Sequence, residues 1–322
     1  MPTEVERFNP LGITPEQAEK IREHNRWAHD LGATTYDDKQ PYMMPSAVTE
    51  FQKDIRYLRS FFPKDSPRVL DLGCGTGFMT LAFAEQLCWV TSVDISSGML
   101  AELRRKIAIE ACTTLTASIQ IVEEDVDKFL ANTDALYDGI VFHSVLHHLP
   151  DYLETLKQAC RRLLPGGFLY IATDPLNRKM MTPLNRWMAR ASELEEKWVN
   201  ASLYRIRYLC ERFWANSLPD AIQKAWRMFY ASGASQRTPD SETKTKPDIS
   251  LVEYHDVCGG IDEQEVIAVL KTQGLQILRS EKFCLYRHAW LTGLARSLRC
   301  PNVFKIIAHS TSSPIPVGGT YE

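Results

Sequence analysis

Residues 69–77 read VLDLGCGTG, and this stretch limits what the chain can fold into more than any other. An apolar run carrying an acid precedes three glycines at alternate positions, and a helix-like run begins at Phe78. Glycine lacks a Cβ atom, so the backbone there can turn with positive φ and approach a ligand closely. The free N–H groups of the following helix attract anionic or polar ligands. The stretch therefore predicts a parallel sheet with a nucleoside-like ligand laid across its end.

The spacing of the glycines narrows the class of ligand. Dinucleotide enzymes favour G-x-G-x-x-G, whereas this chain has G-x-G-x-G, with Phe78 where the third dinucleotide glycine would fall. A second apolar run, 89–93, is followed directly by Asp94. An acid at this place in a nucleotide-binding sheet meets the ribose hydroxyls of the ligand. Asp94 is therefore predicted to bind a ribose.

Together, these motifs resemble those of the class I S-adenosylmethionine-dependent methyltransferases. Within that superfamily the chain is most similar to small-molecule methyltransferases of quinone and natural-product pathways. The likeness covers residues 65–175 in unbroken order and is weaker around 255–285. The motifs that carry it are VLDLGCGTG (69–77), VDISSGML (93–100), Asp125-Val126, YDGIVF (137–142), SVLHHLPD (144–151), LLPGG (163–167) and the HD…GG stretch (255–260).

The resemblance implies a Rossmann-like, doubly wound α/β fold with a mostly parallel seven-stranded sheet, and S-adenosyl-L-methionine as cofactor. It implies that the glycine loop meets the amino-acid part of the cofactor, that Asp94 holds the ribose, and that the acid near residue 125 accepts from the adenine amino group. The residues that it assigns to the cofactor are Tyr36, Asp71, Gly73, Gly75, Asp94, Ile95, Met99, Asp125, Val126 and His143.

Plainer roles remain open for several of these residues. Tyr36 either reaches the cofactor or packs in the interior, and Met99 has the same two alternatives. Asp94 could cap a helix, and Asp125 could be a turn residue. Cys74 lies in the glycine loop, where we expect its side chain to pack.

Methyl transfer is an in-line displacement in which the protein supplies positioning and electrostatics. A general base is needed only where the acceptor must lose a proton, so no fixed catalytic triad is expected. Histidine suits proton transfer near neutral pH, and His255 and His143 are the catalytic candidates. His147 and His148 are interpreted as residues that orient a loop or bond to backbone.

Strand-like runs at 68–72, 89–93, 119–123, 137–142 and 167–173 alternate with helix-like runs, which is typical of a parallel sheet with helices on both faces. The last predicted strands are 275–283 and 304–309. Helices are predicted from a Thr14 cap to Gly32, over 51–62, from Thr182-Pro183 onward, over 217–229, and from an Asp262 cap to Gly274. The predicted divisions are an N-terminal helical lid (1–62), the cofactor-binding core (63–175), a helical cap insertion with a loop (176–250), the C-terminal part of the core (251–310) and a disordered tail (311–322).

Composition and charge limit the partners. The formal net charge is −3, so the whole protein is no polyanion binder. No apolar run approaches the ~20 residues that span a bilayer, and the polar stretch MPTEVERFNP has no apolar core of the kind that signal peptides carry. A cytoplasmic location is therefore expected. The eight cysteines are scattered without a C-x-x-C pair, which argues against a metal site and a disulfide framework.

The segment 176–230 carries ten Lys/Arg against five Asp/Glu, interleaved with aromatics. Such a segment could bind nucleic acid or an anionic membrane, but amphipathic helices with inward tryptophans are the favoured interpretation because no dense basic run exists. A second stretch, AWLTGLARSLR (289–299), could touch lipid at its amphipathic face or pack on the sheet.

The predicted function is transfer of a methyl group to a small, hydrophobic or aromatic acceptor. Four of the seven tryptophans lie between 187 and 226, which favours a bulky apolar acceptor beneath the cap. Two alternatives remain: a cofactor-binding regulatory subunit without transfer activity, and an RNA or tRNA methyltransferase.

Overall fold

The computed structural model describes residues 12–62, 66–110, 118–188, 249–252, 260–286 and 289–310. The chain divides into two compact units, one made of residues 1–186 with 247–322, the other of residues 187–246. Nearly all of the second unit lies outside the described residues, as do the predicted helix over 217–229 and the predicted tail. Every helix and strand labelled below belongs to the first unit.

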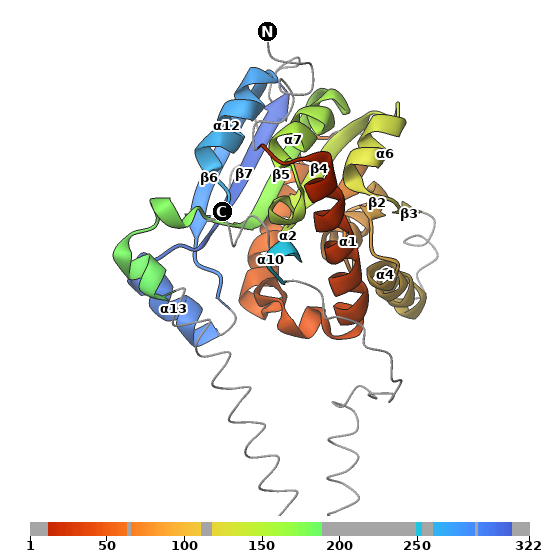
Figure 1. The fold of residues 1–322 in the computed structure, drawn as a ribbon. Helices are drawn as coiled ribbons and strands as arrows, with labels where there is room; N and C mark the ends of the chain where they lie inside the picture. Colours follow the sequence, from red (N-terminus) through yellow and green to blue (C-terminus); the bar gives the residue numbers. More distant parts are fainter. Residues whose placement is uncertain are drawn as a thin grey trace, which may run out of the picture. The chain divides into compact units, whose positions relative to one another are not determined.

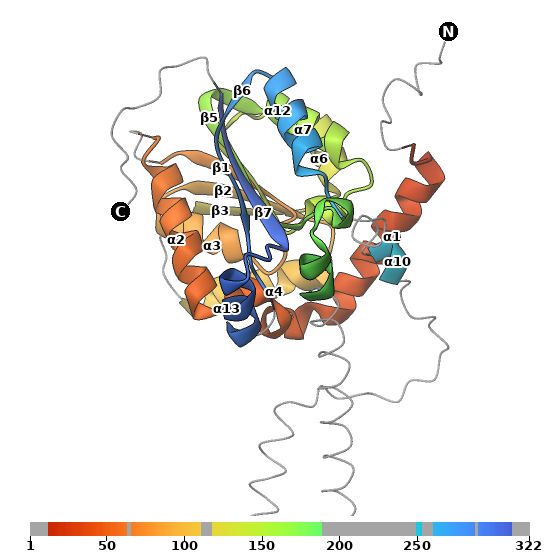
Figure 2. The same ribbon diagram turned by 90° about the vertical axis from the view of Figure 1, so that its left-hand side faces the viewer.

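A seven-stranded sheet forms the centre of this unit, in the order β3-β2-β1-β4-β5-β7-β6 (Figures 1 and 2). The first five strands run parallel, whereas β7 pairs antiparallel with both β5 and β6. This confirms the predicted doubly wound, mostly parallel sheet. The strands are β1 (Arg68–Leu72), β2 (Trp89–Asp94), β3 (Ile119–Glu123), β4 (Tyr137–His143), β5 (Leu163–Pro175), β6 (Leu275–Phe283) and β7 (Val303–Ser310).

Helices cover both faces of the sheet and bury them in two apolar layers (Figure 2). The layer with α6, α7 and α12 includes Leu130, Leu156 and Leu270, and the layer with α2 and α3 includes Leu58 and Phe83. The helices are α1 (Pro15–Gly32), α2 (Pro45–Arg59), α3 (Phe78–Glu85), α4 (Ser97–Glu110), α6 (Val126–Asn132), α7 (Tyr152–Arg161), α10 (Ile249–Val252), α12 (Glu263–Thr272) and α13 (Ala289–Ser297), joined by short 3₁₀ turns at Ala33–Thr35, Asp37–Lys39, Pro41–Met43, Leu146–His148 and Arg178–Met180.

The strand order reverses between β1 and β4, which are neighbours although β2 and β3 lie between them in the chain. Ligands of open α/β sheets bind outside the carboxyl ends of the strands at such a reversal. The predicted motifs follow β1, β2, β3 and β4, so the topology gathers them at this edge.

Local sequence signals placed most helix starts correctly. Thr14 caps α1 in a capping box with Gln17, and the Asp262 side chain caps α12 by accepting from Gln264 N–H. The predicted start of the second helix at residue 51 was wrong, because Pro45 occupies the first turn and the helix begins there. Strand β5 also begins earlier than expected, since Leu163 already pairs with Tyr137.

Among the described residues, no helix combines the length and the apolar character needed to cross a membrane.

Candidate active site

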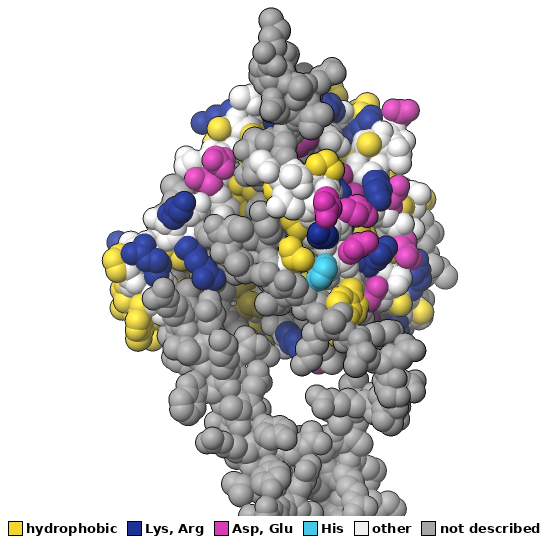
Figure 3. All heavy atoms as spheres, viewed as in Figure 1, with side chains coloured by type: hydrophobic (Ala, Val, Ile, Leu, Met, Phe, Trp, Pro, Cys, Tyr) yellow, Lys and Arg dark blue, Asp and Glu magenta, His cyan; other side chains and the backbone are white. Residues whose placement is uncertain are grey.

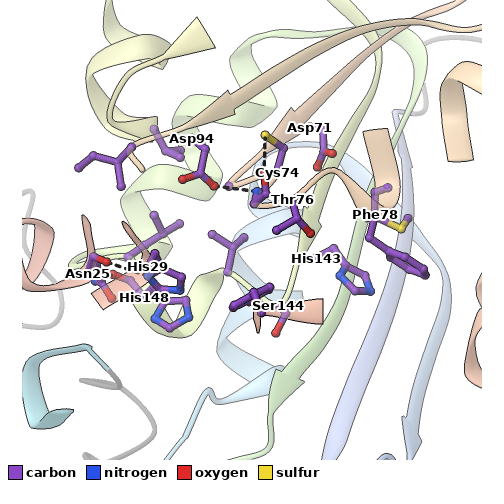
Figure 4. A pocket seen from close by; sticks show the side chains of 18 of the residues that line it. Asn25, His29, Asp71, Cys74, Thr76, Phe78, Asp94, His143, Ser144 and His148 are labelled. Carbon is purple, nitrogen blue, oxygen red and sulfur yellow. Dashed lines mark hydrogen bonds between the residues drawn. The ribbon is translucent and has the colours of Figure 1, made fainter. Parts of the chain in front are cut away.

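A cavity of about 840 Å³, counting the space at its open mouth, lies at the carboxyl ends of β1, β2 and β4 (Figure 4). Figure 4 shows Asn25 and His29 on one side of it, the glycine loop above, and Phe78 with His143 on the other side. Met99 is fully buried and is not one of the lining residues. Nine of the ten predicted cofactor residues do line the cavity: Tyr36, Asp71, Gly73, Gly75, Asp94, Ile95, Asp125, Val126 and His143.

The three loop glycines have positive φ, but they differ in what surrounds them. A Cβ on Gly73 would meet Val145 Cγ2 at 2.2 Å, and one on Gly77 would meet Leu103 Cδ1 at 2.3 Å. These two positions therefore need glycine for packing as well as for backbone conformation. At Gly75 (φ +53°) a Cβ would meet nothing within 4 Å. The open space beside Gly75 belongs to the cavity, where a ligand can approach the backbone.

Asp94 is held by backbone N–H groups of the two loops beside it. Its carboxylate accepts from Gly75 N–H at 2.8 Å and from Ser96 N–H at 2.9 Å. Burial raises the pKa of Asp94, and these N–H groups offset the rise in part. The alternative of a helix cap is wrong for this residue, because Ser96 Oγ accepts from Met99 N–H at the start of α4.

Asp71 is fully enclosed, and among the described residues its carboxyl group meets hydrogen-bond donors of Thr80 but no cation. Thr80 donates to Asp71 Oδ2 at 2.6 Å. Burial raises the pKa of Asp71 to about 7; the nearby Asp94 contributes to this rise, and the hydrogen bonds from Thr80 oppose it. A cationic group entering the cavity would therefore find a carboxyl group ready to lose its proton.

Asp125 both caps a helix and lines the cavity. Its side chain accepts from Lys128 N–H at 3.1 Å at the start of α6. Arg22 Nε lies 3.1 Å from Asp125 Oδ2, and Arg22 also pairs with Asp127 at 2.9 Å. Burial raises the pKa of Asp125, Asp127 raises it too, and Arg22 counteracts both. Asp125 is therefore a helix cap rather than the turn residue of the alternative interpretation, and it also lines the cavity.

His143 ends β4 inside a group of aromatic rings. Its ring centroid lies 4.7 Å from that of Tyr42, 5.1 Å from Phe51 and 5.2 Å from Phe78. His143 Nε2 is buried and has no hydrogen-bond partner among the described residues. Burial lowers the pKa of His143 to about 3, so the imidazole is neutral at ordinary pH. Next to it, the backbone of Ser144 has a φ of +57°, a conformation that residues other than glycine rarely adopt.

The two histidines of the LHHL motif are tied to other segments. His147 Nδ1 lies 2.8 Å from the buried Asp174 Oδ1, and Asp174 also accepts from the His147 backbone N–H. His148 Nδ1 lies 2.8 Å from the carbonyl oxygen of Val252, and His148 also lines the cavity. These contacts support the interpretation that the pair orients its loop. The other catalytic candidate, His255, lies outside the described residues.

The N-terminal segment supplies contacts that the motifs did not reveal. Asn25 Nδ2 donates to the His148 carbonyl at 2.9 Å, and Asp30 accepts from Ser96 Oγ at 2.6 Å. Thr76 Oγ1 donates to Asp37 Oδ1 at 2.5 Å. Together with Arg22, this segment therefore contacts the loop after each of the first four strands. The helix start at Thr14 was visible in the sequence, but these partners are 39 to 123 residues apart.

The lining suits S-adenosylmethionine. An ammonium group can pair with Asp71, ribose hydroxyls can donate to Asp94, and the open space at Gly75 admits the ligand beside the backbone. The unpaired Nε2 of His143 offers a further hydrogen bond. Within the described ranges, no group of three or more His, Cys, Asp or Glu residues is placed to hold a metal ion.

Comparison with known proteins identifies the family. A methyltransferase domain family model matches residues 48–218, just over half of the chain. An uncharacterized methyltransferase of Mycobacterium bovis is 30% identical over 149 residues, which are 45% of this chain and 72% of that protein. The ubiquinone biosynthesis O-methyltransferase of Xylella fastidiosa is 31% identical over 126 residues, 39% of this chain.

The match spans 48% of the Xylella protein, so the chain covers about half of that relative. Among solved structures, the magnesium protoporphyrin IX methyltransferase of Synechocystis aligns with 89% of this chain and 96% of its own at 14% identity, with a TM-score of 0.44. The family match and the seven-stranded sheet agree. The chain therefore belongs to the class I S-adenosylmethionine-dependent methyltransferases, and its cofactor is S-adenosyl-L-methionine.

Proposed function

We propose that this protein transfers a methyl group from S-adenosylmethionine to a small, hydrophobic or aromatic acceptor. The observation that carries the proposal is the lining around His143, where the rings of Tyr42 and Phe78 line the cavity beside a neutral imidazole and Phe51 packs against the same imidazole from outside the lining. Apolar and aromatic walls with a few convergent polar groups are typical of small-molecule sites. The relative from Xylella fastidiosa, a ubiquinone biosynthesis O-methyltransferase, supports the same class of acceptor.

The described residues divide into proposed roles along the cavity. Asp71 and the backbone around Gly75 hold the amino-acid part of the cofactor, and Asp94 holds the ribose. Asp125 and the backbone of Val126 hold the adenine, with Arg22 keeping the Asp125 carboxylate in place at 3.1 Å. When bound, the cofactor supplies an activated methyl group. The residues align this group with the acceptor. Such alignment of two bound reactants can lower the activation barrier of methyl transfer by about 7–11 kcal/mol.

His143 acts in this proposal by hydrogen bonding rather than by taking a proton. A pKa of about 3 makes it a weak base, while the unpaired Nε2 can bond to a ligand group. If the acceptor must lose a proton, His255 stays the predicted base. The proposed helical lid (1–62), the cap (176–250) and a cytoplasmic location stay predictions as well.

A single-turnover assay tests the proposal. The full chain is mixed with methyl-labelled S-adenosylmethionine and a fraction of small phenols and quinols from a cell extract. Label is expected in an organic-soluble product, and Asp94→Ala should abolish it at low cofactor concentration. Ile109→Ser, on the exposed face of α4, is the matched control and should transfer normally.

The alternatives give different results in the same assay. A regulatory subunit would bind the cofactor, seen by calorimetry, without labelling any fraction. An RNA or tRNA methyltransferase would label the RNA fraction and bind RNA with a steep dependence on salt. Either result would overturn the proposed acceptor class while leaving the cofactor assignment intact.

A further inference from the structure

The C-terminal helix α13 leaves part of its apolar surface uncovered. Leu291 and Ala295 of α13 are buried against the protein, but Leu294 and Leu298 are each 43% exposed; Leu298 lies in the turn directly after α13, and its N–H donates to the Leu294 carbonyl. Residues four apart lie on the same side of a helix. Packing and lipid contact, the two predicted alternatives for residues 289–299, therefore apply to different side chains: the buried ones pack, and the exposed leucines are free to meet lipid.

A second segment joins α13 and extends this surface. Asn185 Nδ2 donates to the Pro301 carbonyl at 3.2 Å, and Leu176 N–H donates to the Asn302 carbonyl at 3.0 Å. These bonds hold residues 176–186 beside the end of α13. Leu184, also 43% exposed, lies in this segment. Exposed leucines thus come from two segments more than 100 residues apart in the chain.

Basic residues surround these leucines. No Asp or Glu occurs in residues 175–188 or 282–310, although the whole chain is slightly acidic. Figure 3 shows dark-blue and yellow side chains together at the left, where Figure 1 places α13. We name this surface the basic–apolar patch; it consists of Leu184, Leu294 and Leu298 with the exposed Arg178, Lys179, Arg186, Arg296 and Arg299.

We infer that the basic–apolar patch docks the protein on an anionic lipid bilayer. Helices that lie in a membrane interface combine apolar side chains with Lys and Arg around them. The long stems of arginine cover apolar surface while the guanidinium groups reach the phosphates of lipid headgroups. A single-signed charge on a protein with a net charge of −3 fits a negatively charged surface.

The charge and the leucines favour lipid over nucleic acid. Stacking surfaces for single-stranded nucleic acids use several exposed aromatic rings in succession, whereas the apolar members of this patch are three leucines, and the exposed ring of Trp187 directly follows Arg186. The inference goes beyond the proposed acceptor class, because docking depends on the patch alone. It would also place the protein where apolar acceptors concentrate.

Vesicle co-sedimentation of the full chain tests the inference. One vesicle contains equal parts of phosphatidylglycerol and phosphatidylcholine, and the other contains phosphatidylcholine only. We expect binding to the anionic vesicle, a decrease with added salt, and little binding to the neutral one. Since each basic residue near such a surface contributes roughly a fivefold change in partition, Arg296→Gln with Arg299→Gln should weaken binding by about 30-fold.

The leucines are tested separately with Leu294→Ser and Leu298→Ser, which should weaken binding to the anionic vesicle at high salt more than at low salt. Matched controls lie on α4: Arg104→Gln with Arg105→Gln, and Ile109→Ser, all at exposed positions. These controls should bind as the unchanged protein does. Thermal unfolding confirms that every variant is folded.

Three results would overturn the inference: no binding to either vesicle at low salt, equal losses for the patch and α4 variants, or binding of RNA without binding of vesicles. Methyl transfer to a water-soluble test acceptor should be the same in the patch variants and the unchanged protein. The outcome for lipid is therefore separate from the outcome for the proposed function.

Discussion

Two buried carboxyl groups in this protein have opposite surroundings. Asp54 of α2 is 1% exposed and lies 2.8 and 3.0 Å from Lys305 Nζ, with the Tyr170 hydroxyl donating to it at 3.0 Å. Asp71 of β1 is also 1% exposed, but the described groups that act on it are the hydroxyl and backbone N–H of Thr80 and, at longer range, the acid Asp94.

The comparison distinguishes Asp54, whose carboxylate stabilises the fold, from Asp71, whose carboxyl group is available to a ligand. A buried carboxylate is costly unless a cation and hydrogen-bond donors accompany it. Lys305 fills this role for Asp54 and thereby ties α2 to β7. At Asp71 the cation is missing from the described residues, the pKa rises to about 7, and the carboxyl group faces a cavity. Perturbed groups of this kind gather at functional sites.

Breaking the paired carboxylate should have the largest effect on stability. Asp54→Asn removes the buried carboxylate beside Lys305 and leaves its ammonium with the half-exposed Glu281, 3.3 Å away, so the free energy of unfolding should fall by about 3 kcal/mol, the lower end of the range for a broken buried pair. Chemical denaturation measures this loss. Replacing both partners, Asp54→Leu with Lys305→Met, should recover most of it. If Asp54→Asn and Asp71→Asn reduce stability equally, the proposed difference between the two sites is wrong.

Removing Asp94, the carboxylate proposed to bind the ribose, should mainly affect ligand affinity. Asp94→Ala should weaken S-adenosylmethionine binding by about 1.5–3 kcal/mol, the scale of a hydrogen bond to a charged group. Calorimetry of the folded variant measures this change, and Ile109→Ser serves as the control. An unchanged affinity in folded Asp94→Ala protein would refute the ribose assignment.

Cofactor binding should tighten as the pH rises through the pKa of Asp71. Below about 7 this carboxyl group is mostly protonated, so binding an ammonium group must first release its proton. The affinity should rise about tenfold from about pH 6 to about pH 8. Calorimetry across this range should show the slope in the unchanged protein and a flatter profile in Asp71→Asn. An equal slope in both would mean that another group controls the dependence.

The contrast between the two carboxylates also explains what the sequence could predict. Asp71, Asp94 and Asp125 each follow a local pattern, an apolar strand with an acid or glycines at its end, and the parallel topology brings such ends together. Nothing local marks Asp54, because its partner Lys305 is 251 residues away. The same holds for Arg22, whose partner Asp125 meets it only once α1 lies against the loop after β3.

The boundaries of the strands were also predictable only where local sequence signals decide them. The predicted strands over 68–72, 119–123 and 275–283 match the structure, since apolar alternation and flanking turns are local signals. The early start of β5 depends on pairing between Leu163 and Tyr137, which only the folded sheet decides. The features that the motifs did not predict, such as the Asp54–Lys305 pair and the start of β5, therefore depend on partners that are distant in the sequence.

The smallest expected effect concerns the neutral histidine in the cavity. His143→Phe replaces a buried ring that has an unpaired Nε2 with an apolar ring of similar size, so the ligand-free protein should gain about 1 kcal/mol of stability. The same change should reduce methyl transfer, because the ring can no longer bond to a ligand. Chemical denaturation with and without S-adenosylmethionine separates these effects: the cofactor should stabilise the unchanged protein more than the variant. If the variant is less stable without ligand, packing against Tyr42 and Phe51 requires the imidazole itself, and the assignment of Nε2 to a ligand fails.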